Sequence, residues 1–403
     1  MGVHLNGPNV ITARCNVIRD EVGLRYEVQA DVPGEAPIDL FFEVAGERIP
    51  PPVSRLDFVA LSLVFVAMRK GRPLHIEGSI SRRLLVNLVE FQRAWSLWAP
   101  RLYQPVEVTC SVICDESPSL RRTAVSAFSG GVDATFAMLY HTDGVAKVDQ
   151  LKVNAAVLVQ GFDIGLDQPE AFAVAQSNAR AMTELMGVPL SIVRTNFASV
   201  GSQWTNAFGA GLAACLHLFG EMCDTAVMGT DEDYAHFVLP WGSNPITNQF
   251  LSSAGMIVVS EGGGFTRTEK VAVIARNQKA SEHLRVCWQG PQTGLNCGIC
   301  EKCVRTKLNF LAAGFAVPKC LGVPPSSREV LGLRVQNRTQ LSYLTDILEK
   351  SEKSGVMPAL VRAIRWSIWL NFTRLALGWF ARRFVAQLRR LLGRESGPGS
   401  FRA

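Results

Sequence analysis

The sequence of 403 residues has no run of 18 or more apolar residues, so it predicts no transmembrane helix. Its first residues, MGVHLNGPNVITARCNV, lack the basic start and apolar segment of a secretory signal, which favours a cytoplasmic protein. Disulfides are not expected in that reducing compartment. The sequence has no internal repeat and no Ser-His-Asp or Cys-His pattern typical of a nucleophilic hydrolase.

Charge is also scarce, at 19% of residues, and the net charge of +6 is unevenly distributed. The stretch 361–394 contains eight arginines and no acidic residue, with Trp, Phe and Leu at helical spacings. This basic helix could pack on the protein's own core, dock on a partner protein, or lie on an anionic membrane surface. Nucleic acid is the least favoured partner, because the aromatic residues follow a helical period.

With 48% hydrophobic residues, the chain can bury a large core, and its pattern predicts three regions. Residues 1–120 predict an α+β domain, with strands at 10–18, 24–30, 38–44 and 106–115 and helices at 54–71 and 81–98. Residues 121–335 alternate short apolar strands with helices, which favours an α/β fold with a parallel, doubly wound sheet. Residues 336–403 predict a helical, basic extension.

Such a sheet binds ligands beyond the carboxyl ends of its strands, where the loops SGGVD, QGFDIG and GTDED are expected. The first of these contains Ser129, Gly130 and Gly131 between an apolar strand and a helix. Adjacent glycines let backbone N–H groups surround an anion at a helix N-terminus, so this turn predicts a phosphate site. It matches neither the Walker pattern nor the G-x-G-x-x-G fingerprint.

Four cysteines, Cys287, Cys297, Cys300 and Cys303, lie close together in the sequence, unlike the other six. Four thiolates suit a tetrahedral Zn²⁺ ion, and a filled coordination shell is typical of a structural site. An iron–sulfur cluster is the alternative occupant of the same ligands. The sequence therefore predicts a metal-clamped loop that forms a wall of the ligand site.

The glycine turn resembles the pyrophosphate loop (PP-loop) of the N-type ATP pyrophosphatases, whose pattern is Ser-Gly-Gly-x-Asp-(Ser/Thr). Together with CWQGPQTGLNCGICEKC, it resembles the 7-cyano-7-deazaguanine synthase family within that superfamily. The resemblance covers residues 124–315 and implies a HUP-like PP-loop domain. It also implies ATP with Mg²⁺, an adenylated carboxylate such as a 7-deazaguanine acid, and attack by ammonia. Ser129, Gly130, Gly131, Val132 and Asp133 would then contact the nucleotide.

The chain departs from that family at several positions. Ala134 stands where the family has Ser or Thr, and the hydroxyl of Thr135 could take over the lost phosphate contact. The stretch FDIGLDQPEAF replaces part of the family's substrate pocket. The substrate therefore stays open. More distant relatives, in biosynthetic or phage-defence operons, join the acyl group to another amine, which can belong to a protein. A catalytically degenerate nucleotide-binding partner or assembly protein is the alternative.

Adenylation requires cations near the leaving pyrophosphate. By the resemblance, Asp133 is the first candidate ligand for Mg²⁺. Asp231, at the end of an expected strand, is a second candidate. Gly229 could let the backbone approach the nucleotide. Arg267 and Lys270, expected just before a helix, are candidate catalytic cations at the α-phosphate. The loop PWGSNP, residues 240–245, is a candidate wall for the acyl substrate.

Overall fold

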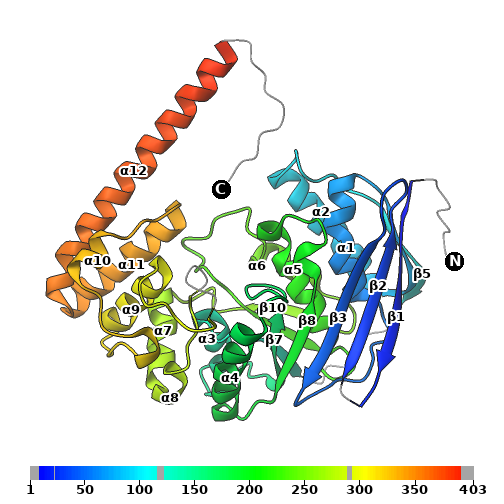
Figure 1. Ribbon diagram of the computed structural model, residues 1–403, viewed down its shortest axis with the longest axis horizontal. Coiled ribbons are helices and arrows are strands. Elements are labelled where there is room, and N and C mark those ends of the chain that lie inside the picture. Colours follow the sequence, from blue (N-terminus) through cyan, green and yellow to red (C-terminus); the bar gives the residue numbers. More distant parts are fainter. Residues whose placement is uncertain (1–8, 22, 116–121, 288–292, 392–403) are drawn as a thin grey trace.

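The computed structural model of the protein describes residues 9–21, 23–115, 122–287 and 293–391, with the backbone alone over residues 378–391. Its ten strands form one sheet in the order β10-β9-β6-β7-β8-β3-β2-β1-β4-β5 (Figure 1). Six of the nine neighbouring strand pairs are parallel. The fold is therefore α/β with a mostly parallel sheet, as the sequence predicts.

The parallel half of the sheet contains the loops that the sequence singles out. Its strands are β6 (Thr123–Ala127), β7 (Lys152–Gln160), β8 (Leu190–Thr195), β9 (Thr225–Gly229) and β10 (Ile257–Glu261). After β6, the strands β7 and β8 lie in order on one side of it, and β9 and β10 lie in order on its other side. This reversal places a topological switch point between β6 and β9, where open α/β sheets bind their ligands.

Helices cover both faces of this half, which is why its strands are mostly apolar. One core joins Ala155 and Val157 of β7 to the helices of one face, and a second joins Ala156 and Leu158 to those of the other. Successive strand residues point to opposite faces, so the two cores lie on opposite sides of the sheet. On the first face, α5 (Trp204–His217) covers this half, and α1 (Asp57–Lys70) and α2 (Arg82–Trp98) lie over the N-terminal part of the sheet. The second face carries α3 (Val132–Thr142), α4 (Pro169–Leu185) and α7 (Arg267–Arg276).

The N-terminal strands extend the same sheet. They are β1 (Ile11–Arg19), β2 (Leu24–Asp31), β3 (Ile38–Gly46), β4 (Leu74–Ser81) and β5 (Val108–Cys114). The antiparallel pairing of β3 with β8 joins the two halves, with Phe42 opposite Thr195 and Gly46 opposite Ser191. The expected α+β elements of residues 1–120 are present, together with β4, which the sequence reading missed. The sheet and its α1–α5 core continue across the expected boundary at residue 120.

The C-terminal helices form a smaller core of their own beside α7. They are α9 (Glu301–Ala312), α10 (Ser327–Leu331), α11 (Arg338–Ser354) and α12 (Pro358–Leu391). Leu308, Ile347 and Ile364 pack together there, whereas the later part of α12 projects away from the body (Figure 1). Two short helices complete the set, α6 (Pro245–Asn248) and α8 (Gln278–Ser281). Within the described part of the chain, no helix has both the length and the hydropathy needed to cross a membrane.

Candidate functional site

The glycine turn lies at the carboxyl end of β6, directly before α3. Gly130 has φ of +73°, a left-handed conformation that favours glycine. Ser129 is exposed, and its Oγ accepts a hydrogen bond of 3.3 Å from the N–H of Gly131. Gly131 is the N-cap residue of α3, and among the described residues no side chain caps it. The free N–H groups and the positive end of the helix dipole are therefore available to an anion.

The end of β9 approaches this helix closely because residue 229 is glycine. A Cβ at Gly229 would lie 2.7 Å from the carbonyl carbon and oxygen of Asp133. Any larger residue would push β9 away from the first turn of α3. The close approach of Gly229 is thus to the α3 backbone, and it brings Thr230 and Asp231 beside the glycine turn.

Two cations converge on the carboxylate of Asp133. Nη2 of Arg267 lies 3.1 Å from one oxygen, and Nζ of Lys270 lies 3.3 Å from the other. Lys270 also donates to the carbonyl oxygen of Thr230, and Arg267 donates to that of Asp231 at 2.9 Å. The structure therefore brings together four predicted site residues from three separate segments of the chain: Asp133, Asp231, Arg267 and Lys270. Both cations come from the first turn of α7, where the sequence reading expected the residues just before a helix.

Burial makes this charge cluster strongly coupled. The side chains of Asp133, Arg267 and Lys270 are 13%, 5% and 1% exposed. Burial alone would raise the pKa of Asp133, but the positive charges of Arg267, Lys270 and Lys302 outweigh it and lower that pKa. Burial also lowers the pKa of Lys270, although the negative charge of Asp133 opposes the change. Each charge of the cluster therefore depends on its partners.

Asp231 forms the other side of the switch point. Its carboxylate accepts a hydrogen bond of 3.2 Å from Nε1 of Trp241, in the loop 240–245 that the sequence predicts as a substrate wall. Burial, followed by the negative charge of Asp133, raises the pKa of Asp231. Both effects disfavour the charged form of the Asp231 carboxylate.

Tyr343 of α11 is a site residue that the sequence reading missed. Its ring lies under two guanidinium groups, with Cζ of Arg305 at 4.4 Å and Cζ of Arg267 at 5.4 Å from its centre. Its hydroxyl is 3.5 Å from the carbonyl oxygen of Asp231, at the limit of a hydrogen bond. The helical extension predicted for residues 336–403 therefore contributes to the site. The helical spacing of α11 gave no signal that distinguishes this tyrosine from a core residue.

Two predicted contact residues of the glycine turn are buried. Val132 is 2% exposed and Thr135 is fully buried. The hydroxyl of Thr135 has no hydrogen-bond partner among the described residues. It is enclosed in the fold, so the structure does not present it at the loop surface as a replacement for the hydroxyl missing at Ala134.

The four cysteines come together as the sequence predicts. Their sulfur atoms all lie within 4.8 Å of one another, with 3.8 Å between Cys287 and Cys300 and 4.0 Å between Cys297 and Cys303. Four sulfurs about 2.3 Å from a central Zn²⁺ would lie about 3.8 Å apart in a tetrahedron. The cluster could therefore bind a metal ion such as zinc. Residues 288–292 of the cysteine motif lie outside the described residues.

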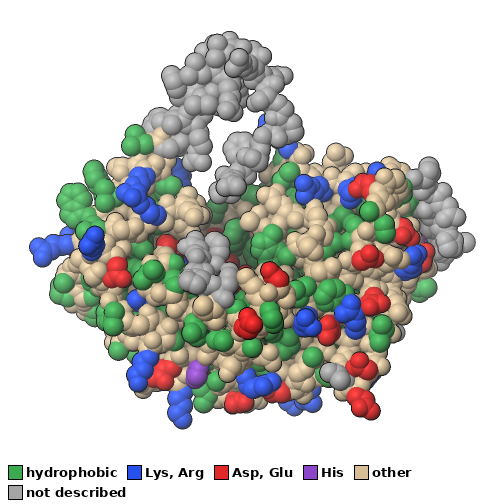
Figure 2. Space-filling model, in the orientation of Figure 1, with side chains coloured by type: hydrophobic (Ala, Val, Ile, Leu, Met, Phe, Trp, Pro, Cys, Tyr) green, Lys and Arg blue, Asp and Glu red, His purple; other side chains and the backbone are tan. Residues whose placement is uncertain are grey.

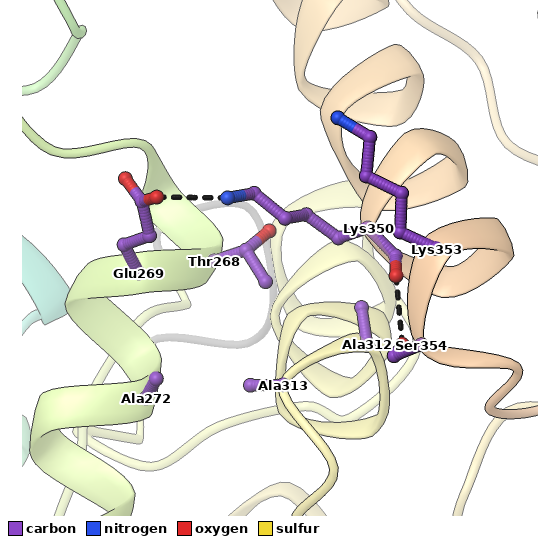
Figure 3. A pocket seen from close by; sticks show the side chains of 8 residues that line it. All are labelled: Thr268, Glu269, Ala272, Ala312, Ala313, Lys350, Lys353 and Ser354. Atoms are coloured by element: carbon purple, nitrogen blue, oxygen red, sulfur yellow. Dashed lines mark hydrogen bonds and ion pairs between the residues drawn. The ribbon is translucent and has the colours of Figure 1, made fainter.

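A cleft of about 290 Å³, separate from the charge cluster around Asp133, lies beside α7 (Figure 3). Helices α7, α9 and α11 line it, and an ion pair of 2.8 Å between Lys350 and Glu269 crosses it. Its lining residues are Thr268, Glu269, Ala272, Ala312, Ala313, Lys350, Lys353 and Ser354. None of them belongs to the charge cluster around Asp133.

Helix α12 has one packed face and one exposed face. Ile364, Ser367 and Asn371 are buried, whereas Trp366 and Trp369 are 59% and 55% exposed. Figure 2 shows acidic and basic side chains mixed over the body, with hydrophobic side chains exposed at the described part of this helix. The expected packing on the protein's own core is therefore present at the start of the helix. A contact with a partner protein or a membrane surface stays a prediction.

Comparison of the chain with protein-family profiles, with characterised proteins and with solved structures finds no match.

Proposed function

We propose that the protein is an ATP-dependent ligase of the N-type ATP pyrophosphatase type, with a HUP-like PP-loop domain. The observation that carries the proposal is the convergence of the glycine turn, Asp133, Arg267 and Lys270 at the switch point of the sheet. A backbone turn that can surround phosphate, next to two buried cations, suits the cleavage of ATP more than hydride transfer or acyl hydrolysis.

In the proposed reaction, the glycine turn binds the β- and γ-phosphates of ATP. A carboxylate oxygen of the substrate attacks the α-phosphorus, the bond to the bridging β-oxygen breaks, and pyrophosphate leaves. Ammonia or an amine then attacks the acyl carbon, AMP leaves with the electron pair of the broken bond, and the nitrogen loses a proton to form an amide. A 7-deazaguanine acid is the first substrate to test, because of the resemblance described above.

The chain's residues have distinct roles in this proposal. Lys270 and Arg267 neutralise negative charge that develops on the phosphates, and Asp133 keeps both cations oriented before ATP binds. Mg²⁺ would accompany ATP near Asp133 and Asp231, the two carboxylates at the switch point. Zinc is the proposed ion of the cysteine cluster, since four thiolates fill its coordination shell and leave no position for catalysis.

The proposal is tested by measuring AMP and pyrophosphate after the full chain is incubated with ATP, Mg²⁺, 7-carboxy-7-deazaguanine and ammonia. We expect turnover in the native chain and a loss of about 100-fold or more in Asp133→Ala. Asp143→Ala, at the other end of α3, serves as the matched control and should keep full activity. If Asp133→Ala unfolds, Asp133→Asn combined with Lys270→Met removes the charge pair together. Unchanged turnover in a folded Asp133 variant would exclude the proposed chemistry.

A nucleotide-binding protein without catalysis is the second candidate function. It is favoured by Ala134, which lacks the usual hydroxyl, and by Thr135, whose hydroxyl is buried away from the turn. The two candidates differ in one measurable respect. Binding of ATP without AMP formation, over a panel of carboxylates and amines, would support the non-catalytic protein.

A further inference from the structure

The segment 284–287 connects the cysteine cluster to the glycine turn. The N–H of Arg285 donates a hydrogen bond of 2.9 Å to the carbonyl oxygen of Gly130. A Cβ at Gly131 would lie 3.6 Å from the carbonyl oxygen of Arg285. Two residues later, Cys287 contributes its sulfur to the cluster. The backbone that leads into the metal ligands therefore lies directly against the turn.

Asn296 fixes this segment from the side of the cluster. Its Oδ1 accepts hydrogen bonds from the N–H groups of Val286, at 2.8 Å, and of Cys287, at 3.2 Å. Its Nδ2 donates to the carbonyl oxygens of Leu284, at 2.7 Å, and of Cys320, at 3.0 Å. One amide side chain therefore binds the backbone on both sides of Arg285, at residues 284, 286 and 287. Asn296 directly precedes Cys297, so its own position is tied to the cluster.

The guanidinium of Arg285 is enclosed, and within the described part of the chain it has few hydrogen-bond partners. Its side chain is 10% exposed, and its Nε has no hydrogen-bond partner among the described residues. Nη1 donates to the carbonyl oxygen of Cys287 at a long 3.4 Å, and Nη2 lies 4.0 Å from a carboxylate oxygen of Asp163. A guanidinium has five N–H donors, and a buried charge with unused donors is costly. An anion bound at the glycine turn would supply the missing acceptors.

The path of the side chain agrees with that role. Cβ of Arg285 lies 3.9 Å from the position that a Cβ would take at Gly130, and the tip approaches Asp163 in the loop after β7. The guanidinium therefore lies between two of the three loops that the carboxyl ends of the strands present. Arginine forms paired hydrogen bonds with phosphate oxygens, which lysine does not.

We infer that Arg285 binds a phosphate group of the ligand held at the glycine turn, and that Asn296 and the cysteine cluster position it. The inference rests on the proposed binding of a nucleotide at that turn. It adds a third cation to Arg267 and Lys270. It also assigns the metal a structural role, because the metal-bound cysteine cluster would fix the segment that carries Arg285.

The test is titration of the metal-loaded full chain with inorganic pyrophosphate and with ATP, followed by calorimetry. We expect Arg285→Met to raise the dissociation constant for pyrophosphate roughly 10- to 100-fold, as for a lost charge-assisted hydrogen bond. Arg285→Lys should be affected less, because it keeps the charge and loses the paired geometry. Arg276→Met, at the exposed end of α7, is the control and should bind as the native chain does. The metal content of all three variants should equal that of the native chain.

The outcomes separate this inference from the proposed function. If the native chain binds neither pyrophosphate nor ATP, the proposed function fails. If the native chain binds them and a folded Arg285→Met variant binds them equally well, only the role of Arg285 fails. Asn296→Ala should weaken pyrophosphate binding only because it displaces Arg285. Once Arg285 is already replaced by methionine, adding Asn296→Ala should therefore cause no further loss of pyrophosphate binding. A further loss in the double variant would overturn the positioning role of Asn296.

Discussion

Asp133→Asn should destabilise the fold substantially, because it leaves two buried cations without their shared carboxylate. Arg267 and Lys270 are 5% and 1% exposed, so water cannot replace the lost partner. Removal of one partner from a buried ion pair costs about 3–5 kcal/mol. Asparagine keeps the size of the side chain, so the loss reflects charge and not a cavity. In urea, the unfolding midpoint should fall by on the order of 1 M.

The measurement is urea unfolding followed by circular dichroism for the native chain, Asp133→Asn, and Asp133→Asn with Lys270→Met. The double variant removes one of the unpaired cations, so it should recover part of the lost stability. Asp143→Asn, at the C-cap of the same helix, should have the same unfolding midpoint as the native chain. A midpoint for Asp133→Asn within error of the native value would refute the coupling between Asp133 and the two cations.

Three further predictions use the same unfolding and binding assays. Gly130→Ala should lower the free energy of unfolding by about 1–2 kcal/mol, because the φ of Gly130 is +73°, and it should weaken ATP binding. Gly144→Ala is the control: its φ is +68° and its surroundings are open, so it should lose similar stability and leave ATP binding unchanged. Cys300→Ser should abolish the bound metal measured by atomic emission and lower the melting temperature, whereas Cys320→Ser, outside the cluster, should keep the metal. The fold lowers the pKa of Asp133, so the ionised carboxylate stabilises the folded chain. This stabilisation is fully present above the unfolded pKa of about 3.9 and is lost as the pH falls through the lower folded pKa. The native chain should therefore lose more stability than Asp133→Asn between pH 5 and pH 2.

Local sequence patterns predicted much of the parallel half. The helix expected after the glycine turn is α3, and the loops SGGVD, QGFDIG and GTDED lie at the ends of β6, β7 and β9 as expected. Apolar strands with helices between them have a strong local signal, because every strand is covered on both faces. By contrast, β4 was missed because its stretch LHIEGSIS contains a glycine and polar residues. The short β10 was missed too, since it follows a serine- and glycine-rich turn.

Contacts between distant segments were harder to predict. The pairing of β3 with β8 depends on the register of strands that lie far apart in the sequence, and no local pattern encodes it. The cysteine cluster was predicted because its ligands are close in sequence. Arg285, just before the first cysteine, carries no periodic or motif signal, and its contact with Gly130 appears only in the folded chain. Charged residues near a motif therefore deserve testing even when they lie outside its pattern.

The most direct test of the account is the exchange of labelled pyrophosphate into ATP, catalysed by the full chain with Mg²⁺ and a carboxylate substrate. Exchange reports the formation of an acyl-adenylate without requiring the acceptor amine to be known. The account predicts exchange that depends on the carboxylate and is reduced in Arg285→Met. Exchange that is absent with every carboxylate tested, from a folded chain that still binds ATP, would contradict it.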